Sequence, residues 1–135
     1  IYRSIEMEYY KAFYDKSLKL YSGLDFSPTF FVNLPVQGEG LQVIQNDFLW
    51  LKLGVNANTI LRERLFSVRL SYYKSLVSKS NKNLKTDADK ISTSLYVEFK
   101  KSNGIEINYQ SLKGTGQVEL DAKLLALSYI YQLEN

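Results

Sequence analysis

The sequence predicts a single α+β domain over residues 1–135, with an antiparallel sheet of about four to six strands and three helices. Three observations favour this class. Two long segments without Gly or Pro carry apolar residues at helical spacing, and a segment near residue 100 alternates apolar with polar residues as a strand does. The composition, 45% hydrophobic and 23% charged, is that of a folded domain.

The first predicted element is an N-terminal amphipathic helix over residues 2–21. Its apolar side chains fall near one helical face at Tyr2, Ile5, Tyr9, Phe13 and Leu20. Gly23 supplies a stop signal, because glycine adopts the left-handed conformation after a helix at little cost. Tyrosines nearly encircle this helix, so we expect Tyr9, Tyr10 and Tyr14 to contact a partner surface, with ordinary core packing as the alternative.

Residues 28–53 are predicted to form β structure. Pro35 removes a backbone donor and indicates an edge position, and residues 38–40 are typical of a turn. Asn46 and Asp47 separate two apolar runs, which favours a tight hairpin or a bulged long strand. Trp50, the only tryptophan, is expected in the core.

Residues 59–78 fit two templates. Leu61, Leu65, Val68, Tyr72 and Leu76 have helical spacing, whereas the stretch 66–72 alternates apolar with polar residues. We predict a middle helix, because the segment has no Gly or Pro and is long for one strand; a strand is the alternative.

The last third of the chain contains the clearest pattern. Residues 80–90 are predicted to be a polar loop. Residues 95–100 and 105–109 then alternate in polarity around Lys101-Ser102-Asn103-Gly104 and predict a hairpin. Residues 118–133 carry apolar groups nearly all round a helical wheel and predict a C-terminal core helix, with a strand over 118–124 as the alternative.

Basic residues concentrate in the middle of the chain. Residues 62–85 contain seven basic residues and one acidic residue, interleaved with aromatic rings, a composition that can serve phosphate backbones and stacked bases. A solvated face followed by a lysine-rich loop is the simpler interpretation. The candidate binding residues are Arg62, Arg64, Arg69, Lys74, Lys79, Lys82 and Lys85.

The chain has neither histidine nor cysteine, which excludes thiol nucleophiles, thiolate metal sites and the usual general base. We therefore identify no catalytic residue, metal site or cofactor. Glu98 and Lys100, with Asp87 or Asp89 upstream, match a metal-dependent nuclease pattern, but a charged outer strand face explains them better. Residues 113–116 fit no phosphate-binding signature and are expected to form a plain turn.

The expected function is a non-catalytic interaction or assembly module whose partner is another protein or a second copy. Binding of nucleic acid or another polyanion through residues 62–85 is the alternative. Ile1 as the first residue suggests a product trimmed from a longer or anchored chain. No apolar run approaches the roughly 18 residues of a transmembrane helix, so none is expected. The sequence leaves the compartment open.

Overall fold

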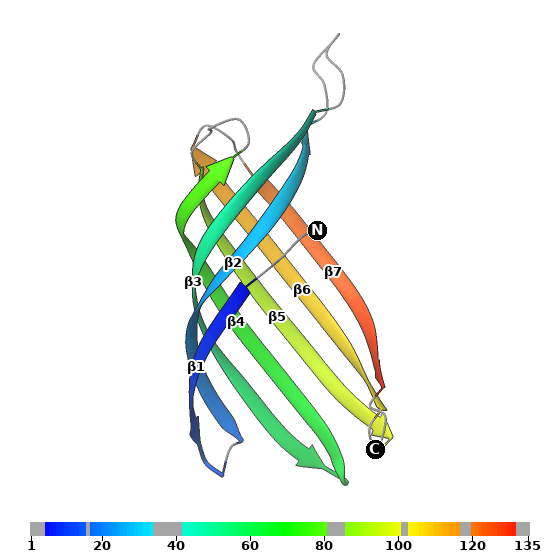
Figure 1. Ribbon diagram of the computed structural model, residues 1–135. Coiled ribbons are helices and arrows are strands. Elements are labelled where there is room, and N and C mark those ends of the chain that lie inside the picture. Colours follow the sequence, from blue (N-terminus) through cyan, green and yellow to red (C-terminus); the bar gives the residue numbers. More distant parts are fainter. Residues whose placement is uncertain are drawn as a thin grey trace.

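The computed structural model describes residues 5–15, 17–33, 42–80, 86–100, 103–116 and 120–131. Every regular element in this part of the chain is a strand, and each strand pairs antiparallel with its neighbours in sequence (Figure 1). The strands are β1 (Ile5–Phe13), β2 (Leu18–Asn33), β3 (Gln42–Leu61), β4 (Arg64–Ser80), β5 (Thr86–Lys100), β6 (Asn103–Gly116) and β7 (Leu120–Tyr131).

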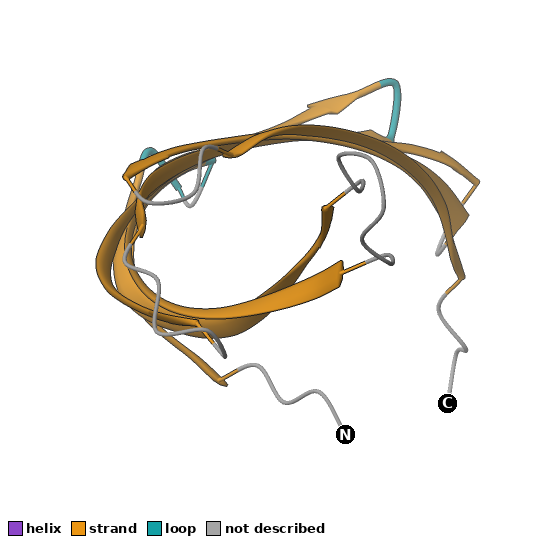
Figure 2. Ribbon diagram, turned by 90° about the horizontal axis from the view of Figure 1, so that it is seen from above, coloured by secondary structure: helices purple, strands orange, loops and turns teal. Residues whose placement is uncertain are grey.

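The seven strands form one sheet, and Figure 2 shows that this sheet curls so that one face is concave. Contacts between strands that are not neighbours identify the concave face. Tyr21 on β2 is hydrogen-bonded to Ser71 on β4, and Lys52 on β3 pairs with Glu8 on β1. Side chains can meet across an intervening strand in this way on the inside of a curl. We call this concave side the inner face and the opposite side the outer face.

Two hairpin turns are built by residues in the left-handed region. Tyr14 and Asp15 have φ values of 49° and 51° after β1, and Arg62 and Glu63 have values of 50° and 64° between β3 and β4. At the second turn Leu61 pairs with Arg64, and positive φ at both central residues is the geometry of the two-residue hairpin turn that matches strand twist. The first turn is longer, because Phe13 pairs with Leu18. Glycine and asparagine favour this geometry, so these turns lack their usual sequence signal.

A small mixed core lies on the inner face. Phe48 and Trp50 stack with their ring centroids 4.6 Å apart, and Ala88 and Leu112 complete the buried apolar cluster. Trp50 is 1% exposed, which confirms its predicted place in the core. Buried polar residues lie around this cluster, among them Lys52.

The predicted α+β class is wrong, because the described residues contain seven antiparallel strands and no helix. The described residues of the segment predicted as an N-terminal helix instead form β1, a turn and the start of β2. Its apolar spacing also fits a strand, since Ile5, Met7 and Tyr9 share the outer face while Glu6 and Glu8 share the inner face. The expected stop at Gly23 lies inside β2.

The predicted middle helix over 59–78 is likewise wrong. Its residues form the end of β3, the turn at Arg62 and Glu63, and most of β4. The strand alternation at 66–72 was the correct template. The predicted C-terminal helix over 118–133 is also wrong, because residues 120–131 form β7.

The predictions of β structure fare better. The hairpin around residue 102 is confirmed as β5 and β6, and residues 42–53 belong to β3. Asn46 and Asp47 lie inside β3, so the tight turn expected there does not form. Residues 86–90 of the predicted polar loop are strand, and residues 113–116 are the end of β6. Pro35 and the turn at 38–40 lie outside the described residues.

Candidate functional site

The outer face carries apolar side chains on all seven strands. Cross-strand register places Ala57, Val68, Leu95, Ile107 and Leu127 in one continuous row over β3 to β7. Four of these side chains are exposed large hydrophobic groups, and Leu127 reaches 74% exposure. Further exposed apolar residues extend this row on both sides: Ile5, Met7, Leu20, Leu24, Phe26, Leu51, Leu53, Leu70, Ile91, Ile105 and Leu125.

The apolar surface, which we call the outer band, has a defined height along the strands. On β5 it runs from Ile91 to Phe99, and on β3 from Leu53, which shares the cross-strand row of Ile91, to Leu61. At a rise of about 3.3 Å per residue, each nine-residue run covers roughly 26 Å of strand. Aromatic residues lie at one end of the outer band, near the ends of β5 and β7, where Phe99 and Tyr129 contact each other with ring centroids 6.1 Å apart.

Charged side chains mark the other end of the outer band. The register places Lys74 opposite Asp89, Asp89 opposite Lys113, and Lys113 opposite Asp121, so opposite charges alternate across β4 to β7. Lys74 Nζ lies 3.3 Å from Asp89, and the Tyr72 hydroxyl donates to the same carboxylate at 2.6 Å. We call this row the charged rim.

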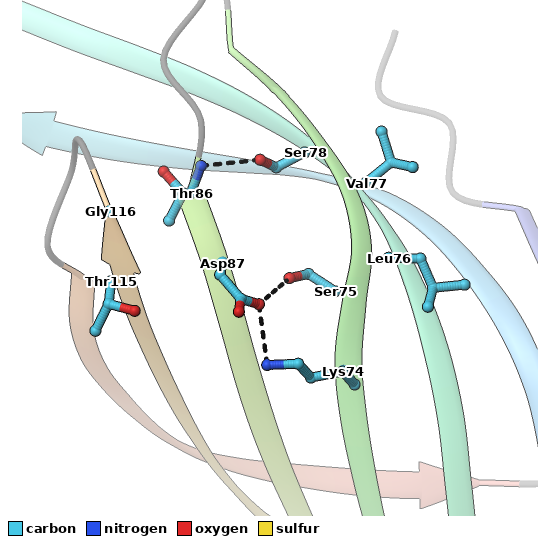
Figure 3. A pocket seen from close by; sticks show the side chains of 9 residues that line it. All are labelled: Lys74, Ser75, Leu76, Val77, Ser78, Thr86, Asp87, Thr115 and Gly116. Atoms are coloured by element: carbon cyan, nitrogen blue, oxygen red, sulfur yellow. Dashed lines mark hydrogen bonds and ion pairs between the residues drawn. The ribbon is translucent and has the colours of Figure 1, made fainter.

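A groove opens at the charged rim because β4 and β5 separate beyond Lys74 (Figure 3). Hydroxyl groups replace the missing backbone pairing: Ser75 accepts from the Ala88 amide at 2.8 Å, and Ser78 accepts from the Thr86 amide at 3.0 Å. Asp87 accepts from Ser75 and pairs with Lys74 at 2.9 Å. Hydrogen bonds from Lys74 and Ser75 lower the pKa of the Asp87 carboxyl.

The inner face carries buried charges in place of a continuous apolar core. Lys52, whose side chain is 3% exposed, pairs with Glu8 at 2.7 Å and also with Glu6. Lys90 lies 3.7 Å from Asp25, and Arg69 lies 3.9 Å from Glu8. Three cations therefore face three carboxylates, and two of these carboxylates compensate the buried ammonium of Lys52.

Aromatic rings separate these inner cations. Arg69 and Lys52 lie over the Tyr21 ring at 5.1 and 5.0 Å, and Lys52 also lies 5.7 Å from the Tyr73 ring. Lys90 lies over the rings of Tyr73 and Trp50 at 4.0 and 5.1 Å. The order is a ladder of alternating cations and rings, in which each ring face stabilises a neighbouring charge.

Gly54 makes room for this ladder. A Cβ added there would lie 2.3 Å from the Tyr21 ring and 2.6 Å from the Leu70 carbonyl oxygen. The absence of a side chain therefore lets the Tyr21 ring lie across β3, where its hydroxyl reaches Ser71 at 2.6 Å.

The three candidate tyrosines do not form one surface. Tyr9 lies on the outer face, whereas Tyr10 is paired with Tyr21 on the inner face and lies beside Lys19. Tyr14 belongs to the turn after β1 and is exposed.

The basic residues of 62–85 are also dispersed. Arg62 and Arg64 lie at the turn between β3 and β4, Arg69 faces inward, and Lys74 and Lys79 lie near the opposite end of β4. The distance along β4 from Arg64 to Lys79 is roughly 50 Å at the usual strand rise. Lys82 and Lys85 lie outside the described residues. The described basic residues therefore form no single patch.

The nuclease-like residues are separated as well. Glu98 lies on the inner face, where it accepts a hydrogen bond from the Leu65 amide at 3.0 Å. Asp87 and Asp89 face outward at the charged rim, and the side chain of Lys100 is outside the described part. No group of three or more potential metal ligands occurs within the described ranges.

Sequence reasoning missed the residues that organise the inner face. Lys52 lies within an apolar run and gave no signal of its own, since its carboxylate partners are more than forty residues away. The alternation of side chains around Lys52 is a usable signal that it faces the same way as Trp50. Leu51 and Leu53 share the opposite, outer face. Strand periodicity alone does not say which of these faces is buried.

Comparison with family models, curated proteins and solved structures gives no match for this chain. Across the described residues, no helix is long and apolar enough to cross a membrane.

Proposed function

We propose that this chain is a non-catalytic, membrane-embedded module whose outer band contacts lipid acyl chains. The observation that carries this proposal is the inverted polarity of the sheet. Leu95 and Leu127 are exposed, while Lys52 and Lys90 lie on the inner face among carboxylates and rings. This proposal retains the non-catalytic interaction function expected from the sequence, but the partner is lipid instead of a protein.

Energetics favour lipid over water around the outer band. Removing one Leu, Ile or Phe side chain from water contributes about 1.5–3 kcal/mol. If the sheet were surrounded by water, the apolar side chains of all seven strands would stay hydrated and this free energy would not be gained. Contiguous apolar patches of such extent mark contact surfaces. In hydrocarbon the same side chains carry no such cost, and Lys52 and Lys90 stay shielded on the inner face.

The dimensions of the outer band support the same partner. A strand that crosses the hydrocarbon core needs about 9–11 residues when tilted, and the runs on β3 and β5 each have nine. Aromatic residues at one end and the charged rim at the other match the two polar boundaries of a bilayer. The strands β2 to β6 have a hydrogen-bonded neighbour on both sides, and backbone N–H and C=O groups in hydrocarbon require such pairing.

The proposal is tested by folding the full chain from urea with and without vesicles of a zwitterionic phosphatidylcholine. We expect a β-type circular dichroism spectrum and flotation with the vesicles at both low and high salt. A neutral lipid surface and high salt together remove simple charge attraction as the cause of binding.

Two results would contradict this function and identify another. A chain that folds without lipid into an oligomer of defined size, and stays out of the floated fraction, would be a protein-contact module. A chain that remains in buffer and binds labelled DNA or RNA, with affinity falling steeply as salt rises, would be a polyanion binder.

A further inference from the structure

A cavity of about 430 Å³ opens on the inner face. Its wall combines apolar side chains with polar ones, and its residues include Ser27, Trp50, Lys90, Gln110, Leu112 and Leu124. The volume lies within the range of about 300–1,000 Å³ that is typical of small-molecule sites. Like those sites, it places a few polar groups in a largely apolar wall.

One wall residue has an unused hydrogen-bond donor. Trp50 is 1% exposed, and its indole N–H has no acceptor among the described residues. A buried polar group without a partner costs about 1–3 kcal/mol, so such groups are uncommon in native interiors. A ligand atom that accepts a hydrogen bond would remove this cost.

The charge of the cavity wall indicates whether its ligand is an anion or a cation. Lys90 lines the cavity from the inner face, and no acidic residue among the described ones lines it. The nearest carboxylate to Lys90, that of Asp25, lies at 3.7 Å, which is longer than a direct charged hydrogen bond of about 2.7–2.9 Å. Lys90 also lies 5.1 Å from the Trp50 ring, so the ammonium and the indole belong to the same part of the wall.

We propose that this cavity binds a small organic anion, namely a carboxylate attached to an apolar body. The carboxylate lies beside Lys90 and accepts hydrogen bonds from the Trp50 indole and the Gln110 amide. The apolar body packs against Leu112 and Leu124. This binding function goes beyond lipid contact at the outer band and uses the opposite face of the sheet.

The single tryptophan gives a direct measurement. The folded full chain is titrated with three compounds of similar shape: cyclohexanecarboxylate, cyclohexanecarboxamide and cyclohexylmethylammonium. We expect saturable changes in Trp50 fluorescence with the carboxylate, binding at least tenfold weaker with the amide, and none with the ammonium compound. Equal responses to all three, a preference for the ammonium, or no saturable response to the carboxylate would overturn the proposal.

Variants test the assigned contacts. Lys90→Gln should weaken binding of the carboxylate at least tenfold and leave the affinity for the amide unchanged. Gln110→Leu should also weaken binding of the carboxylate, and this second variant removes no charged residue from the inner face. Lys11→Gln, on the outer face of β1, is the matched control and should bind as the wild type does, because no described residue of β1 lines the cavity. Unchanged carboxylate affinity in folded Lys90→Gln and Gln110→Leu would refute the site. The Trp50 titration reports ligand binding by the folded chain in vesicles or in buffer, so its failure is distinguishable from a failure of the flotation test.

Discussion

A lysine in place of Leu95 should lower the free energy of unfolding by very different amounts in lipid and in water. Leu95 lies on the outer face, 41% exposed, and its cross-strand neighbours are Val68 and Ile107. A lysine at the centre of a lipid-facing strand costs about 2–4 kcal/mol, whereas an exposed substitution in water changes stability by about 0.5 kcal/mol or less. Leu95→Lys therefore separates the two environments by a measurable margin.

Val77 supplies the control. It is 58% exposed, more than Leu95, but lies on β4 between Lys74 and Lys79 near the charged rim. Lysine close to a membrane interface costs only about 0–1 kcal/mol, because its ammonium reaches water. In lipid, Leu95→Lys should be destabilised by at least 1 kcal/mol more than Val77→Lys, which is about the difference between these two ranges.

The assay is equilibrium urea unfolding from phosphatidylcholine vesicles, followed by Trp50 fluorescence. A shift of 2–4 kcal/mol in the free energy of unfolding corresponds to roughly 30- to 900-fold in the equilibrium constant. Equal, small effects at both positions would refute the assignment of the outer band to lipid. A larger effect at Val77 would also contradict it.

Three further predictions concern turns and the inner face. Gly54→Ala should destabilise the chain by about 1–3 kcal/mol in the same assay, because the added methyl group displaces the Tyr21 ring. Replacing Arg62 by Asn and Glu63 by Gly should raise the free energy of unfolding by about 1 kcal/mol, since both residues have positive φ; no gain would contradict the assigned turn. Lys52→Met should cost about 1–3 kcal/mol by leaving two acidic partners uncompensated, and neutralising both acids by Gln should restore most of that loss; no restoration would refute the pairing.

The sequence predicted strands where turn signals accompany the alternation. The hairpin of β5 and β6 has Asn103 and Gly104 beside its turn, and its alternation was sufficient. The turn between β3 and β4 instead uses Arg62 and Glu63 at positive φ. Because no Gly or Pro marks this turn, two strands look like one long segment in the sequence, and the length of that segment favours a helix.

The N-terminal prediction failed for a related reason. Tyr14 and Asp15 make the turn after β1 with positive φ, so no residue marked the boundary. Ile5 and Tyr9 satisfy helical and strand spacing alike, since four residues equal two strand repeats. The inner ion pairs join residues more than forty positions apart, and no local pattern identifies such partners.

The central claim is that the outer face meets lipid and the inner face does not, and β5 allows the most direct measurement. The chain has no cysteine, so single cysteines can be introduced from residue 91 to residue 97 and labelled with an environment-sensitive fluorophore. In vesicles containing a lipid-borne quencher, labels at Ile91, Thr93, Leu95 and Val97 should be quenched, and labels at Ser92, Ser94 and Tyr96 should not. Quenching that is uniform along β5, or strongest at the serines, would contradict the account.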